Sequence, residues 1–357
     1  MSKRAAAASR EPGPPAFAPP YPPSLVDRLI AWLDRQPVPV WLILLAAAAV
    51  VLAILTAVQW REGAYAVGTF NPLHAMASAY VPFLVWLIRY LDRSAASALQ
   101  EFRPALMSES EAMPLRYRLT TLPRTATLFV GGATALAIGL MAWLFSADLR
   151  LLEVAPTLLS EAVFGAVLIA TWWATGVFVY HTVRQLVLIH EIYTRRTRID
   201  VFQLTPLYAF SHHTRRTAVA ILLFVYLDFL IADPTLRYHP LNLGVGATLA
   251  LLAVVAFVGP LGGVHRLLAA EKTRLVDDNA RRLEAGFREL QKRMDSLRLA
   301  GADDLNKTLS SLEIERTALL RIPTWPWEPG TIRGLAAALL LPILIWLIQF
   351  ALGRWLG

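Results

Sequence analysis

Seven apolar stretches divide this chain, and each is long enough to cross a bilayer as a helix, which takes about 20 residues. A hydrophobic fraction of 56% places the whole chain in the same class. The sequence therefore predicts an all-α, polytopic membrane protein with seven transmembrane helices. The predicted spans are residues 40–58, 73–91, 126–147, 157–180, 217–232, 241–262 and 334–353.

The basic residues indicate how these spans are oriented. If the N-terminus is cytoplasmic, 30 of the 34 Lys and Arg residues lie on or at the cytoplasmic side, and the four outside are Arg61, Arg150, Arg237 and Arg354. The reverse orientation would invert this ratio, which the positive-inside rule disfavours. We therefore expect the N-terminus inside, the C-terminus outside, and a multi-pass protein of the plasma or inner membrane.

Composition and missing motifs narrow the function. The net charge of +8 lies in the cytoplasmic loops, which favours anionic lipid over a nucleic acid as its partner. The chain has no cysteine, and it lacks a His-Glu-x-x-His motif, a Gly-rich phosphate loop and a Gly-x-Ser-x-Gly motif. His212 and His213 are adjacent, so on a helix they point about 100° apart and do not suggest a metal site. We expect neither an enzyme nor a cofactor.

Four segments organise the chain. Residues 1–39 are rich in proline and are expected to form a disordered cytoplasmic tail, with a docking motif as the alternative. Residues 40–262 hold the first six spans with cytoplasmic helical extensions. Residues 263–333 form a cytoplasmic segment, and residues 334–357 carry the last span.

The segment 263–333 has a heptad pattern, which predicts a coiled-coil hairpin between the sixth and seventh helices. Gly301 breaks the pattern and is followed by a shorter return helix. We expect Val276, Ala280 and Leu283 to stay uncovered near the membrane unless the return strand or another subunit covers them. The residues expected to serve assembly are Val276, Leu283, Phe287, Leu290, Trp325 and Trp327. The alternative for the two tryptophans is an interfacial belt.

Ionisable residues inside the spans suggest a binding site, because each costs about 2.5–3.5 kcal/mol at the bilayer centre. Asp228 lies in the fifth span beside Tyr226, Glu161 in the fourth, and His74 begins the second. All of them are expected in the outer leaflet, where they would form a pocket for a small molecule or a cation. The alternative is that Asp228 is hydrogen-bonded between helices and that Glu161 reaches outward to water.

The last span carries a candidate gate. Pro342 frees a backbone carbonyl near mid-membrane, and Ile345 and Gln349 follow on the same helical face. Such an apolar stripe with one amide suits a hydrophobic gate, or an ordinary contact within the bundle.

The arrangement resembles the insect gustatory and odorant receptors, a family of seven-helix ligand-gated cation channels. Gustatory members carry Thr-Tyr, five hydrophobic residues and Gln-Phe in the last span, and here Gln349-Phe350 matches whereas Pro342-Ile343 does not. The resemblance implies a tetramer with the last span around a pore.

Two functions remain open from the sequence. The first is a non-enzymatic ligand-gated channel or sensor that forms a homo-oligomer, with the last helix lining a pore. The second is a membrane-anchored scaffold or signalling adaptor that acts through its cytoplasmic hairpin.

Overall fold

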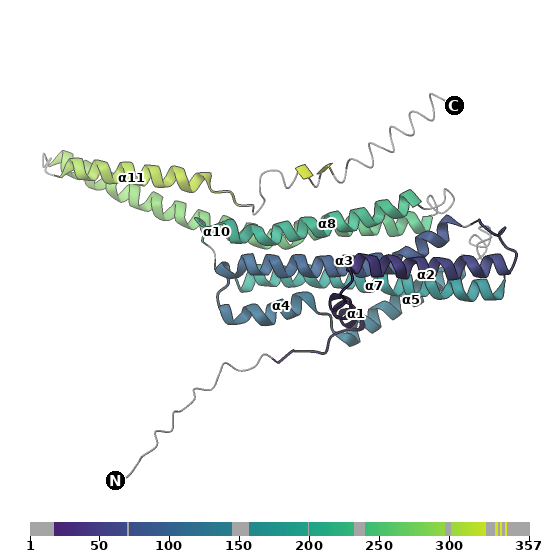
Figure 1. The fold of residues 1–357 in the computed structure, drawn as a ribbon. Helices are drawn as coiled ribbons and strands as arrows, with labels where there is room; N and C mark the ends of the chain where they lie inside the picture. The colour runs from purple at the N-terminus through teal and green to yellow at the C-terminus, as the bar shows by residue number, and fades with distance from the viewer. Residues whose placement is uncertain are drawn as a thin grey trace, which may run out of the picture.

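The computed structural model describes residues 18–69, 71–144, 157–198, 200–231, 240–296 and 301–325, with a few positions between 333 and 340. These residues form helices and no β-strand, which confirms the predicted all-α class. The long helices lie side by side in a bundle, and the end of α10 protrudes from it together with α11 (Figure 1). The helices are α1 (Leu25–Asp34), α2 (Val40–Arg61), α3 (Pro72–Phe102), α4 (Ala112–Thr120), α5 (Arg124–Leu144), α7 (Leu158–Arg195), α8 (Thr205–Ile231), α10 (Pro240–Asp295) and α11 (Ala302–Arg321), with short 3-10 turns at Arg103–Ala105 and Glu109–Glu111.

Four helices of the described part are long and apolar enough to cross a membrane: α2, α5, α7 and α10. Little of α2 or α5 is buried, as suits helices whose outer faces meet lipid. The predicted second and fifth spans lie within α3 and α8, which pack against each other and carry buried polar side chains. Their position inside the bundle explains why they are less apolar than α2.

Two helices are much longer than a membrane is thick. The 38 residues of α7 correspond to about 57 Å, and the 56 residues of α10 to about 84 Å. Because the hydrocarbon core is about 30 Å thick, both helices continue well beyond any span they make. The fourth and sixth predicted spans are therefore parts of helices that also build the region next to the membrane.

The interior of the bundle divides into two large apolar clusters. The first, here called the membrane core, contains Leu84 and Leu91 of α3, Val177 of α7 and Ile221 of α8. The second is named the cytoplasmic core after the orientation expected from the sequence, and it contains Phe102 of α3, Tyr193 of α7 and Phe210 of α8. The same three helices thus run through both cores.

The hairpin of α10 and α11 packs through half of the heptad pattern. Leu283 is buried, and its neighbours Asn279 and Gly286 face Leu312 and Leu309 of α11. The expectation that Leu283 stays uncovered is wrong, because α11 runs back along α10 until Lys272 donates hydrogen bonds to the carbonyls of Leu320 and Ile322. The alternate positions Ala280, Phe287 and Met294 remain exposed.

Small residues let α5 and α7 approach closely. The four-residue spacing of Gly131, Ala135 and Gly139 predicts such a contact. In the structure a side chain at Gly131 would collide with Trp173, whereas Gly139 faces open space. Across the same contact, a Cβ at Gly176 of α7 would lie 2.7 Å from the Cβ of Thr134 on α5. The close approach thus depends on Gly131 and Gly176.

We predict that Gly176→Ala destabilises the protein by about 1–3 kcal/mol, because the added methyl group forces α5 and α7 apart. Gly139→Ala is the matched control and is expected to leave stability unchanged, because nothing lies within 4 Å of its Cβ. The measurement is the thermal unfolding midpoint of the purified protein in detergent. Equal midpoints for the two variants would contradict the close contact.

Candidate functional site

A layer of buried polar side chains separates the membrane core from the cytoplasmic core. It comes from α3, α7 and α8, at the point where each helix leaves the membrane core. Buried hydrogen-bonding groups are costly unless they are paired, so such a layer is a strong constraint on helix packing. Its members are Asp92, Ser94, His181, Gln185, His213 and Thr217.

The α7 side of the layer is organised around one carboxylate. Nε2 of His181 lies 2.8 Å from Oδ1 of Asp92 on α3, and both side chains are largely shielded from solvent. The amide nitrogen of Gln185, one turn after His181, donates to the carbonyl of Leu119 at 3.0 Å and lies 3.5 Å from the same Oδ1. These contacts join α7 to α3 and to the end of α4.

The α8 side of the layer centres on His213, which is fully buried. Its Nε2 lies 3.1 Å from Oε1 of Gln185, and its Nδ1 lies 3.1 Å from Oγ of Ser94 on α3. The guanidinium of Arg216 also donates to Ser94 Oγ, at 3.3 Å. Gln185 therefore uses both ends of its amide, one toward Asp92 and one toward His213.

These contacts assign the protons. The amide oxygen of Gln185 can only accept, so His213 must carry its proton on Nε2 and accept from the Ser94 hydroxyl at Nδ1. Nε2 of His181 is hydrogen-bonded to Oδ1 of Asp92, and its Nδ1 has no partner among the described residues. All contacts of His213 are made with a neutral ring.

Electrostatics agree with a neutral His213. Burial lowers the pKa of His213 from its ordinary 6.5 to about 3, and the positive charges of His181 and Arg216 would act in the same direction. Burial also raises the pKa of Asp92 above its ordinary 3.8, although His181 opposes this shift. The layer therefore resists charging in both directions: His213 resists protonation, and Asp92 resists ionisation.

Contacts at the surface connect this layer to the N-terminal segment. Arg184, next to Gln185 on α7, donates to the carbonyl of Thr121 at 3.2 Å and to the hydroxyl of Tyr21. The Tyr21 hydroxyl in turn donates to the Thr121 carbonyl, and Tyr117 donates to the backbone carbonyl of Tyr21. The segment before α1 is thus held against α4 and α7.

The pocket predicted in the outer leaflet is only partly described. His74 is buried and its ring lies 5.3 Å from that of Phe164 on α7. Glu161, one turn before Phe164, is exposed and does not share this buried setting. Tyr226 packs against the membrane core, and the side chain of Asp228 lies outside the described residues. The described residues thus bring His74 to α7, and the four-residue pocket stays a prediction.

The other predicted site residues fall into two groups. Pro342, Ile345 and Gln349 of the gate lie outside the described residues, as does Trp327. Val276 and Leu290 are partly buried on the hairpin. Trp325 stacks on His265 of α10, with ring centroids 3.9 Å apart, and the Thr324 carbonyl is 3.2 Å from His265 Nδ1. The segment after α11 therefore reaches α10 close to the bundle.

The polar layer is not among the structures predicted from the sequence, although the sequence holds a usable signal for it. His181 and Gln185 are four residues apart just after the fourth predicted span, and His213 and Thr217 are four apart at the start of the fifth. Polar pairs at this spacing share a helical face. A face that stays polar on two helices at the same membrane boundary indicates a contact between them.

Comparison of the chain with protein-family models, with curated proteins and with solved structures returns no match. Within the described residues no three His, Asp or Glu side chains are arranged to hold a metal ion. The geometry of the polar layer is that of a helix-coupling element, and its histidines are used in hydrogen bonds between helices.

We predict that acidification from pH 7 to pH 5 destabilises the protein through His213. Because the folded pKa lies below the unfolded value of 6.5, the stabilisation is complete above pH 6.5 and is lost as the pH falls toward 3. One such group contributes about 2 kcal/mol between pH 7 and pH 5. His213→Gln is expected to flatten this dependence, measured as the unfolding midpoint against pH.

The raised pKa of Asp92 acts in the opposite sense, since protonation of its carboxyl favours the folded state at low pH. The His213 contribution is therefore the difference between the wild-type and His213→Gln profiles. His212→Gln, which changes the adjacent histidine, serves as the control. Parallel profiles for the wild type and His213→Gln would show that His213 does not resist protonation.

Proposed function

We propose that this chain is a seven-span sensor of the plasma or inner membrane, N-terminus inside and C-terminus outside. The four apolar helices of the described part support a membrane location, and the placement of the basic residues supports the orientation. The observation that carries the sensor function is the polar layer, which couples the membrane core to the cytoplasmic core through three continuous helices.

The coupling follows from how the layer is paired. If α7 shifted along α3 by one hydrogen-bond length, Gln185 would lose its contacts with Leu119 and His213 together. Leaving these buried groups unpaired costs about 1–3 kcal/mol each, so small independent shifts are disfavoured. A ligand that moves α7 in the membrane therefore moves α3 and α8 in the cytoplasmic core as well.

In its most specific form the sensor is a homo-oligomeric ligand-gated cation channel, a tetramer with the last helix around the pore. Asp228, Glu161, His74 and Tyr226 would receive the small molecule or cation, and Pro342, Ile345 and Gln349 would form the gate. This form is supported by the resemblance of the topology and of Gln349-Phe350 to the insect receptors.

We predict that the detergent-purified protein is a tetramer by light scattering and passes monovalent cations in liposomes. Gln349→Leu and Asp228→Asn are expected to reduce flux at least tenfold while the tetramer persists. Gln36→Leu, in the turn after α1, is the control amide substitution. A monomer, or tetrameric wild-type protein without flux, would contradict the channel.

A second function, a scaffold, is favoured by one observation on the hairpin. Ala280, Phe287 and Met294 lie seven residues apart on α10 and all three are exposed, and Ala280 and Phe287 line the groove between α10 and α11. Seven-residue spacing keeps them on one face of the helix. An apolar stripe of this kind on a segment outside the membrane suits another helix, from a second copy or a partner.

We predict that Phe287→Gln combined with Met294→Gln abolishes assembly through the hairpin without unfolding it, since both side chains are more than half exposed. Ile314→Gln is the control, because Ile314 is even more exposed, at 72%, but lies on α11 outside the stripe. Oligomeric mass and helical content are measured together. Loss of oligomeric mass with unchanged helical content supports the scaffold. Unchanged mass in the double variant rejects the stripe as an interface.

A further inference from the structure

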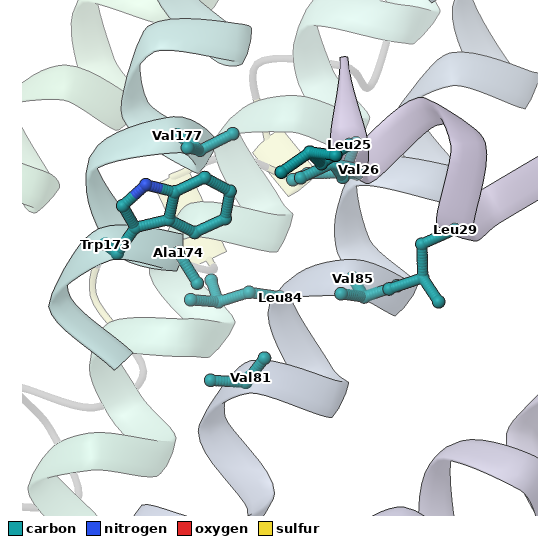
Figure 2. Close-up of a pocket in the computed structure, with 10 residues that line it drawn as sticks. Leu25, Val26, Leu29, Val81, Leu84, Val85, Trp173, Ala174 and Val177 are labelled. Atoms are coloured by element: carbon teal, nitrogen blue, oxygen red, sulfur yellow. The ribbon is translucent and has the colours of Figure 1, made fainter. Parts of the chain in front are cut away.

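The amphipathic helix α1 lies crosswise to the long helices and closes one side of an apolar pocket (Figure 1). The pocket has a volume of about 210 Å³ and is lined by side chains from three helices. Figure 2 shows Leu25 and Leu29 of α1, Leu84 and Val85 of α3, and Trp173 and Val177 of α7 around it.

The pocket has a buried floor and an exposed rim. Leu84 and Val177 are fully buried, whereas Leu25 is 48% and Leu29 41% exposed. An apolar cavity of about 150 Å³ stays free of water and accepts a hydrocarbon molecule. The pocket here is lined by aliphatic side chains and the ring of Trp173, so hydrocarbon is the occupant it suits.

The acidic and the basic residues of α1 have different surroundings. The dipeptide Asp-Arg occurs twice, seven residues apart, at Asp27-Arg28 and Asp34-Arg35. Both acids are turned toward the protein: Asp27 accepts hydrogen bonds from Ser24 and Leu122, and Asp34 pairs with Arg89 and Arg93 of α3.

The two arginines of these dipeptides are available to a partner outside the described residues. Arg28 and Arg35 are exposed and make no ion pair with a described residue. Being seven apart, they share a face of α1, and Arg28 directly precedes the rim residue Leu29. Positive charge beside an apolar pocket at the start of a membrane bundle matches an anionic lipid headgroup above an acyl chain.

We propose that the pocket between α1, α3 and α7 binds an anionic phospholipid of the inner leaflet. One acyl chain lies over Leu84 and Val177, between Trp173 and the rim residues, and the headgroup pairs with Arg28 and Arg35. The inner-leaflet position rests on the proposed orientation, because α1 precedes the first span and the pocket residues of α3 and α7 lie in the cytoplasmic halves of their spans.

Binding is tested by the unfolding midpoint of the full-length protein in neutral detergent with added lipid. Dioleoylphosphatidylglycerol is expected to raise the midpoint by about 2–4 °C, and dioleoylphosphatidylcholine is expected to raise it much less. In Arg28→Gln/Arg35→Gln the concentration of phosphatidylglycerol needed for half the effect rises about tenfold. Equal responses to the two lipids would overturn the headgroup assignment, and an equal response to oleic acid would make the ligand a free fatty acid.

Pocket occupancy is tested separately from charge. Leu29→Trp fills the rim and is expected to remove the phosphatidylglycerol effect, whereas Leu45→Trp, at another exposed leucine on α2, keeps it. Loss of the effect in both variants, or in neither, would overturn the proposed pocket.

A second measurement needs no substitution in the pocket rim. In phosphatidylcholine liposomes, a trace of phosphatidylglycerol brominated on its chains is expected to quench Trp173. The quenching is measured as the difference between the wild type and Trp173→Phe, with Trp143→Phe as the lipid-exposed control on α5. Equal quenching at both positions would mean bulk lipid contact and would overturn the site. Because this readout needs neither flux nor oligomers, its failure is distinguishable from failure of the proposed function.

Discussion

Where α3, α7 and α8 pass from one apolar core to the other, each polar side chain that remains buried needs a partner, and the amide of Gln185 supplies two. Its nitrogen binds the Leu119 carbonyl and lies 3.5 Å from Oδ1 of Asp92, and its oxygen binds His213, so one side chain connects α7 to α3, α8 and the end of α4. An aliphatic side chain could fill the same volume but would leave both groups unpaired. Hydrogen bonds therefore position the two cores relative to each other, whereas apolar contacts position the helices within each core.

The same requirement explains how α1 is held. A helix of 10 residues is too short to be stable alone in water, so its position depends on contacts outside it. The Asp27 carboxylate accepts from the Ser24 amide in the capping box of α1, and it also accepts from the Leu122 amide between α4 and α5, which holds the helix in place. The preceding Tyr21 contacts Arg184, which is adjacent to Gln185. Movement of α1 by a lipid in the neighbouring pocket would therefore reach the polar layer through only two side chains.

The sequence predicts the helical class well because apolar runs of this length leave few other structures open. It cannot predict the polar layer in detail, because Asp92, His181 and His213 are far apart in the chain and meet only when three helices pack. The hairpin shows a similar limit. Leu283 and Phe287 are equivalent in a heptad pattern, yet the single helix α11 covers the first and leaves the second exposed.

The residues of the site predicted in the outer leaflet show a similar limit. Counting ionisable residues identifies His74 and Glu161 as unusual, but burial separates them, since His74 packs on Phe164 while Glu161 is exposed. A charge at the end of a span can reach water, whereas a ring inside a helix contact cannot. Distance from the span end is therefore a weaker guide than the helical face on which a residue lies.

Helix α10 links these regions because it runs without a break from the bundle into the hairpin. Where it leaves the cytoplasmic core, His265 stacks on Trp325 and Lys272 binds the last carbonyls of α11. The chain after Trp325 leads to the predicted last span, most of which lies outside the described residues. A displacement of α8 or α7, both packed on α10, would be carried by α10 to the exposed stripe of the hairpin. Sensing and assembly would in that case depend on one helix, which carries both the contacts with α7 and α8 and the exposed stripe.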